Sequence, residues 1–135
     1  MKLVESCSCN WLTENFNPME PKSKFNELDE LVIIWCKLID VTTDCNVDMV
    51  CKNSTLNEVV KISVPIKRTT EKEPARRVWT VMDTKATNVF HSFVGKWIVD
   101  IMSENTLLAS ESFEYCKIAN REMLLSNNSI FDISI

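Results

Sequence analysis

The residues best suited to binding chemistry lie between Lys67 and Arg77, in the segment KRTTEKEPARR. It has five cationic side chains and two glutamates, a local net charge of +3 in a chain of net charge −4. Such a cluster attracts an acidic protein surface or a phosphate-bearing ligand, and salt screens the attraction. The alternative is a solvated connection that keeps strand edges apart. The candidate partner-binding residues are Lys67, Arg68, Lys72, Arg76 and Arg77.

Two other surfaces are candidates for contact with a protein partner. Pro65 lies in an alternating run, and proline lacks a backbone N–H, so it is tolerated mainly at the edge of a sheet. That edge offers unpaired backbone groups for strand addition. If neither the basic loop nor this edge is used, the N-terminal segment that carries Trp11 and Phe16 is the next candidate. We expect no nucleic-acid partner, because the net charge of −4 is unlike that of nucleic-acid-binding domains.

Six cysteines could bind a metal, form disulfides or remain free thiols: Cys7, Cys9, Cys36, Cys45, Cys51 and Cys116. Structural zinc usually takes ligand pairs spaced by two to four residues, whereas one residue separates Cys7 from Cys9. The single histidine, His91, has no partner at ligand spacing. The N-terminus has no apolar stretch typical of a secretory signal, so we expect a cytoplasmic protein with reduced thiols. The sequence therefore predicts no metal site and thiols that pack as small hydrophobic groups.

The sequence offers little for catalysis or cofactor binding. A phosphate-binding loop needs several glycines, and this chain has one, Gly95. No local signature pairs a cysteine with His91 as nucleophile and base. The adjacent acids Asp29 and Glu30 precede a strand and fit a solvated loop. We therefore predict no catalytic residue, no cofactor and no enzymatic activity.

The elements that position these residues follow from the hydrophobic pattern. Period-two alternation, typical of half-buried strands, recurs along the chain with polar turns between the runs. Glu30–Ile39 is apolar at consecutive positions, which predicts a central strand covered on both faces. The other predicted strands are Cys45–Lys52, Val59–Ile66 at a sheet edge, Val78–Met82, and a hairpin from Lys96–Met102 through the tip Ser103–Thr106 to Phe113, Tyr115 and Ile118.

A chain of 135 residues with 45% hydrophobic side chains is long enough for one domain, residues 1–135, with one core. No apolar stretch reaches the length of a membrane span. Residues 1–28 are predicted as an irregular segment packed on this core, with a short edge strand at Cys7–Trp11. The aromatic residues expected to anchor the segment are Trp11, Phe16 and Phe25. Residues 119–135 form a C-terminal extension that includes one short helix at Asn120–Ser126.

One motif resembles the glycine-x-tryptophan opening of lipocalins and fatty-acid-binding proteins: Phe93-Val94-Gly95-Lys96-Trp97, followed by Ser103-Glu104-Asn105. The resemblance implies a small β-barrel that carries an apolar ligand. In those barrels the motif opens the first strand, whereas here it comes late in the chain. The barrel carrier therefore stays an alternative, as does a thiol- or metal-dependent regulatory protein.

The same hairpin has a second resemblance. Gly95 and Trp97 open one strand and the other returns to Phe113, an arrangement similar to the last hairpin of small immunoglobulin-like sandwiches. Trp35 in the central strand fits such a core. We predict an all-β, antiparallel β-sandwich with an immunoglobulin-like layout, in which Trp35 and Trp97 share one core. The corresponding function is a non-enzymatic protein–protein interaction or binding module.

Overall fold

The computed structural model describes residues 1–53, 58–84 and 94–117, and within them every regular element is a strand. The strands are β1 (Lys2–Cys9), β2 (Trp11–Leu12), β3 (Pro18–Met19), β4 (Lys24–Asn26), β5 (Leu31–Ile39), β6 (Cys45–Lys52), β7 (Glu58–Ile66), β8 (Ala75–Asp83), β9 (Gly95–Ser103) and β10 (Thr106–Cys116). The all-β prediction is confirmed. The predicted helix at 120–126 lies outside the described residues. A search of those residues finds no helix with the length and apolar character needed to cross a membrane.

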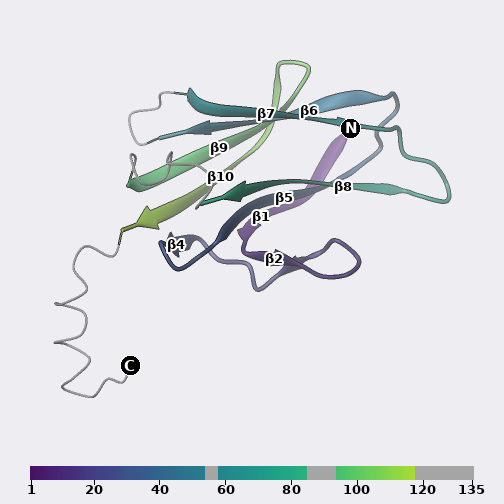
Figure 1. Cartoon of the computed structure of the whole chain (residues 1–135). Coiled ribbons are helices and arrows are strands. Elements are labelled where there is room, and N and C mark those ends of the chain that lie inside the picture. The colour runs from purple at the N-terminus through teal and green to yellow at the C-terminus, as the bar shows by residue number, and fades with distance from the viewer. Residues whose placement is uncertain (54–57, 85–93, 118–135) are drawn as a thin grey trace, which may run out of the picture.

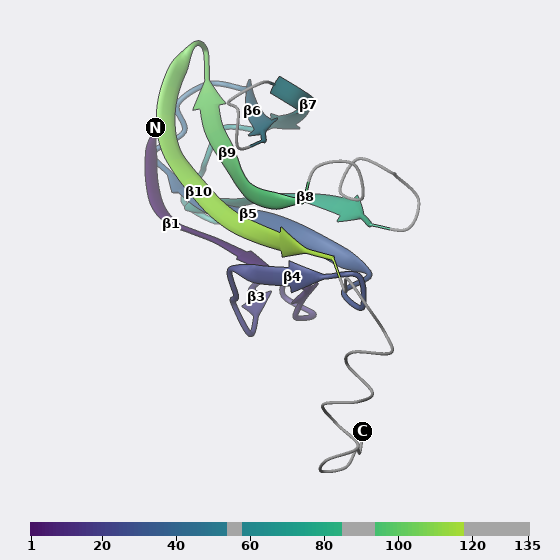
Figure 2. The ribbon, with the colours of Figure 1, turned by 90° about the vertical axis from the view of Figure 1, so that its left-hand side faces the viewer.

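Two sheets face each other as the layers of a sandwich (Figure 1). One has three strands in the order β1-β5-β8, and the other has five in the order β4-β10-β9-β6-β7. The pairings within them are antiparallel, except that β10 runs parallel to the short β4 alongside its end (Figure 2). Apart from the two-stranded β2-β3 hairpin, the described strands thus form two separate sheets rather than one closed barrel. The predicted sandwich is confirmed, and the barrel alternative is wrong.

The main core lies between the two sheets, and period-two alternation decides which side chains enter it. In β9, Trp97, Val99 and Ile101 are at most 1% exposed. The Trp97 ring stacks on Phe113 of β10 with centroids 6.2 Å apart, and Phe25 of β4 meets Phe113 edge-on at 5.5 Å. Since residues i and i+2 of a strand share a face, each strand of the pair contributes one apolar row.

Strand β5 buries both faces, as predicted, but the two faces enter different clusters. Ile34 belongs to the main core, whereas Ile33 and Trp35 pack with Cys9 on the outer face of the three-stranded sheet. The prediction that Trp35 and Trp97 share one core is therefore wrong. Adjacent residues of a strand point to opposite faces, and Trp35 is one position out of phase with the side chains that face Trp97.

The outer cluster is covered by the segment that contains the two-stranded β2-β3 hairpin (Figure 1). Phe25 is buried as predicted, and the ring of Phe16, although 52% exposed, stacks on Trp79 beside the outer cluster. Trp11 is 55% exposed, so the prediction that it anchors this segment on the core is wrong. Leu12, rather than its neighbour Trp11, is the residue that packs on the outer cluster. Alternation along the hairpin turns one of these two side chains inward and the other outward.

The N-terminal segment is also more regular than predicted. The strand that was expected to be short and to start at Cys7 begins at Lys2 and pairs with β5 over its length, with one irregularity between Leu3 and Glu5. Asn10 follows the last residue of the strand, and its side-chain amide donates to the Leu31 carbonyl at 2.9 Å. The Asn10 side chain thereby bonds the backbone of β5 at the first residue of that strand.

Asp29 ties this covering segment to the start of β5. One of its carboxylate oxygens accepts from Lys22 Nζ at 2.7 Å and from Asn10 Nδ2 at 3.1 Å, and the other accepts from the Asn26 backbone N–H at 2.8 Å. Burial by itself raises the pKa of Asp29. These hydrogen bonds and the Lys22 charge lower the pKa by more than burial raises it, so the net shift is downward. The ionised carboxylate is therefore the form that the fold holds.

The β9–β10 turn connects two long paired strands through two residues. Its central residues Glu104 and Asn105 have φ values of 50° and 66°. Positive φ at both positions is typical of a type I′ turn, whose twist matches that of the flanking strands. The predicted tip is confirmed. At the other end of β9, Gly95 has a φ of 122°, a conformation that side chains rarely allow, which explains the single glycine.

Candidate functional site

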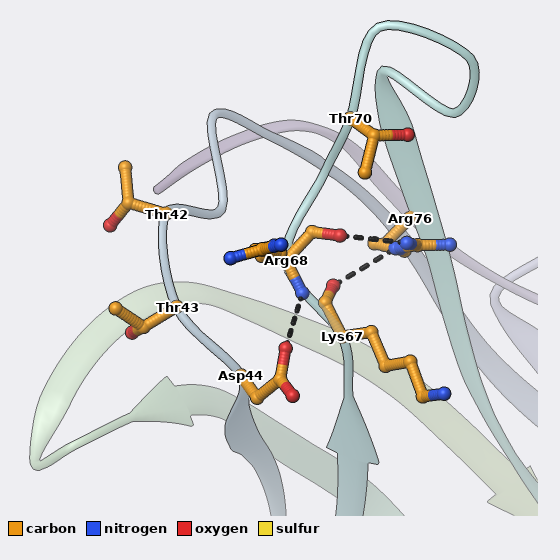
Figure 3. Close-up of a pocket in the computed structure, with 7 residues that line it drawn as sticks. All are labelled: Thr42, Thr43, Asp44, Lys67, Arg68, Thr70 and Arg76. Atoms are coloured by element: carbon orange, nitrogen blue, oxygen red, sulfur yellow. Dashed lines mark hydrogen bonds between the residues drawn. The ribbon is translucent and has the colours of Figure 1, made fainter.

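Two connections lie side by side at one end of the sandwich: residues 40–44, between β5 and β6, and residues 67–74, between β7 and β8. We call this region the loop end. A hollow of about 600 Å³ lies between the two connections (Figure 3). Its lining residues are Thr42, Thr43, Asp44, Lys67, Arg68, Thr70 and Arg76. Three of the five predicted partner-binding residues thus line one hollow.

Hydrogen bonds between the two connections hold the backbone of the loop end. The Thr69 backbone N–H donates to the Val41 carbonyl at 2.8 Å, and the Thr69 hydroxyl bonds both the Val41 N–H at 3.1 Å and the Val41 carbonyl at 3.2 Å. Next to this pair, the Arg68 N–H donates to Asp44 Oδ1 at 2.9 Å. Val41 itself is 1% exposed, so the core anchors the arrangement. The backbone that carries Lys67 and Arg68 is therefore held in place by these hydrogen bonds.

Arg76 joins the start of β8 to the loop that precedes it. Its Nε donates to the Lys67 carbonyl at 2.9 Å and its Nη2 donates to the Arg68 carbonyl at 2.7 Å (Figure 3). Nη1 forms an ion pair with Glu73 at 2.9 Å. All three guanidinium nitrogens are engaged, and the fork geometry of arginine suits such multiple bonding. Arg76 therefore positions Lys67 and Arg68, and less of its charge is free for a partner.

Lys67 and Arg68 carry the charge that remains available. Both are exposed, and neither the Lys67 ammonium nor the Arg68 guanidinium has a hydrogen bond or ion pair with any described residue. The Arg68 side chain extends toward the connection that bears Thr42 and Thr43, whose hydroxyl groups add donors to the same hollow (Figure 3). The arrangement can present two cations and several hydroxyl groups to one acidic group.

The remaining two predicted residues lie elsewhere. Arg77 is part of β8, which begins at Ala75 rather than at the predicted Val78, so the loop is shorter than the predicted 67–77. Its Nε donates to Asn17 Oδ1 at 2.7 Å, on the side of the sheet opposite the main core. Since Arg76 and Arg77 are adjacent strand residues, their side chains leave opposite faces. Lys72 is exposed and does not line the hollow.

Sequence reasoning missed the contribution of residues 42–44. Thr42, Thr43 and Asp44 form a polar turn after the central strand, a pattern found in most connections. Nothing local in this turn indicates that it lies beside a loop some 25 residues further on; that follows only from the pairing of β6 with β7. The early start of β8 did have a local signal, because Arg77, Trp79 and Val81 alternate with Arg76, Val78 and Thr80.

The thiols do not form a comparable site. All six cysteines are free. Burial, with smaller contributions from Cys9 and Glu111, raises the pKa of Cys7 to about 12, and burial also raises the pKa of Cys9. Within residues 1–53, 58–84 and 94–117, no group of three His, Cys, Asp or Glu side chains could hold a metal ion. His91 lies outside these ranges.

Comparison with known proteins identifies the fold only. No protein-family model matches the chain, and no curated protein matches its sequence. Among solved structures, the chain is similar to an immunoglobulin-like protein from Pseudomonas aeruginosa, with a TM-score of 0.51 and 10% sequence identity, covering 84% of this chain and 94% of that one. This similarity confirms the predicted immunoglobulin-like layout.

Proposed function

We propose that the protein is a non-enzymatic interaction module that binds an acidic segment of a partner protein at the loop end. The observation that carries the proposal is a pair of exposed cations, Lys67 and Arg68, on a backbone that hydrogen bonds hold between two loops. An immunoglobulin-like sandwich supports this use, because loops on a rigid scaffold are common binding sites. The cytoplasmic location stays a prediction.

The fixed backbone favours binding because a partner meets side chains whose attachment points are already ordered. Ordering an interface on association costs free energy, and a loop that is held beforehand avoids part of that cost. The bonds from Thr69 to Val41 and from Arg76 to the loop carbonyls provide this order. The flexible parts that remain are the side chains of Lys67 and Arg68.

The charges favour a carboxylate-rich segment over an apolar ligand. Most residues that line the hollow are exposed to solvent. Each ion pair formed there therefore contributes little binding free energy by itself and is weakened by salt. Cations of this kind act mainly by raising the association rate of an oppositely charged partner. Asp44 lines the same hollow, but its carboxylate already accepts the Arg68 backbone N–H.

The test is a titration of the isotope-labelled full chain with poly-L-glutamate, followed through backbone amide chemical shifts at low and high salt. We expect saturable shifts in residues 42–44 and 67–70 that weaken as salt rises. The variant Lys67→Glu/Arg68→Glu should bind at least about tenfold more weakly, a change of about 1.4 kcal/mol. The matched control is Lys24→Glu/Lys96→Glu, which reverses two exposed lysines in a different hollow and should bind like the wild type.

Equal loss of binding in both double variants would contradict the proposal, because the interaction would then depend on net charge alone. Binding that is insensitive to the Lys67→Glu/Arg68→Glu change, with shifts in other residues, would show that the acidic segment binds elsewhere. Strand addition at β7, the edge that carries Pro65, would instead produce shifts along Lys61 and Ser63.

A further inference from the structure

The β2-β3 hairpin exposes three large apolar side chains. Trp11 is 55%, Phe16 is 52% and Met19 is 50% exposed, all within nine residues of sequence. Trp11 and Met19 are register partners on adjacent strands, so their side chains leave the same face of the hairpin. Isolated exposed hydrophobic residues are common, but three on one small element make a surface of the kind that contacts other proteins.

Phe16 is held in this exposed position at a conformational cost. Its φ of 61° lies in the left-handed region, which is rare for a bulky residue. Two contacts hold it there: its ring stacks on Trp79 with centroids 4.9 Å apart, and its carbonyl accepts Trp35 Nε1–H at 2.8 Å. Strained residues that the surroundings fix in this way often belong to binding sites. The ring is therefore an ordered aromatic anchor with one half open to solvent.

The charge beside these apolar side chains is negative. Glu14 and Glu20 are exposed, and residues 11–21 contain no lysine or arginine. The next cation along the chain, Lys22, forms an ion pair with Asp29 at 2.7 Å. Arg77 is half-buried and donates to Asn17 Oδ1. A partner that covers the apolar side chains thus meets two open carboxylates at its margin.

We infer that the β2-β3 hairpin is a second interaction surface, which binds a protein segment that combines apolar side chains with lysine or arginine. The apolar groups would cover Trp11, Phe16 and Met19, and the cations would lie opposite Glu14 and Glu20. A second copy of this chain fits less well, because a symmetric contact through the hairpin brings the same carboxylates together. This surface is distinct in residues and opposite in charge from the loop end.

The test is a selection of random linear peptides against the full chain, with counter-selection on the variant Trp11→Ser/Met19→Ser. We expect the hairpin-dependent peptides to be enriched in aromatic or aliphatic residues together with Lys or Arg. Their affinity should fall at least tenfold in this variant and also in Glu14→Lys/Glu20→Lys. Both Leu28→Ser/Leu107→Ser, which removes two other exposed hydrophobic side chains, and the loop-end variant Lys67→Glu/Arg68→Glu should bind them like the wild type.

Three results would overturn the inference. One is a selection that yields no peptide dependent on Trp11 and Met19. Another is a set of hairpin-dependent peptides that are neutral or acidic, or whose affinity is unchanged by Glu14→Lys/Glu20→Lys. The third is a wild-type dimer in sedimentation that Trp11→Ser/Met19→Ser converts to a monomer, because a second copy would then be the occupant. Since the loop-end variant is a control here, the two proposed surfaces can fail separately.

Discussion

Burial holds several thiols of this protein in the protonated form. It raises the pKa of Cys36 to about 12 and that of Cys51 to about 11, from a usual value of 9.0. The charge of Glu111 also raises the pKa of Cys36, by less than burial does. The thiolate is the reactive form of cysteine, so these residues are poor nucleophiles near neutral pH. At the scale of single residues, they pack as the small hydrophobic groups that the sequence predicts.

We expect alkaline pH to destabilise the fold through these thiols. Their pKa values are higher in the folded than in the unfolded chain, so their contribution is complete below about pH 9 and is lost as pH rises toward 11–12. The free energy of unfolding, measured with urea between about pH 7 and 10.5, should decline less steeply in Cys36→Ala/Cys51→Ala than in the wild type. An equal decline in both proteins would assign the effect to other groups.

The loop end illustrates how whole elements are joined. Residues 40–44 and 67–74 are two connections that each cross from one sheet to the other, and Thr69 bonds one to the other through its hydroxyl and its backbone. Arg76 then fixes the beginning of β8 to the same loop. The cations that could recognise a partner therefore depend on a neutral threonine and on an arginine whose own charge is largely used.

We expect Thr69→Val to lower the free energy of unfolding by about 1–3 kcal/mol, because the buried Val41 N–H loses its hydrogen-bond acceptor. The matched control is Thr42→Val, which removes an exposed hydroxyl from the same hollow and should change stability by less than about 0.5 kcal/mol. Chemical denaturation of the three proteins measures both effects. Similar stability of the two variants would show that the Thr69 bonds contribute nothing net.

At the scale of the whole molecule, two apolar clusters lie on opposite faces of the β1-β5-β8 sheet. The larger fills the space between the main sheets, and the smaller lies under the covering segment. Trp35 belongs to the smaller cluster and Met49 to the larger. Because the clusters differ in size and in the strands that they join, their loss should have different consequences for folding.

We expect Met49→Ala to destabilise the entire fold by about 2–5 kcal/mol, since it leaves a cavity in the main core. Trp35→Phe removes the hydrogen bond to the Phe16 carbonyl and should cost about 1 kcal/mol, mainly in the hairpin. Native-state hydrogen exchange distinguishes the two. Amides of Thr13 and Phe16 should exchange faster in Trp35→Phe while those of β9 and β10 stay protected. Uniform acceleration in Trp35→Phe would contradict this division.

Much of the fold could be predicted from local pattern. The alternation of Trp97, Val99 and Ile101 located β9 and its buried face, and the apolar run before Ile39 located the central strand. Pro65 marked a strand that does lie at the edge of its sheet. These predictions hold because burial on one face of a strand imposes a period of two on the sequence, whatever the rest of the chain does.

The sequence by itself determined the longer strands, the all-β class and the presence of a basic cluster between Lys67 and Arg77. Only the tertiary structure decided that Arg68 lies beside residues 42–44, that Arg77 leaves the other face of its sheet, and that Phe16 remains open to solvent. The physical reason is the distance along the sequence over which each feature is decided. Strand periodicity is read within a few residues, whereas the neighbours of a loop or an aromatic side chain depend on which distant strands are paired.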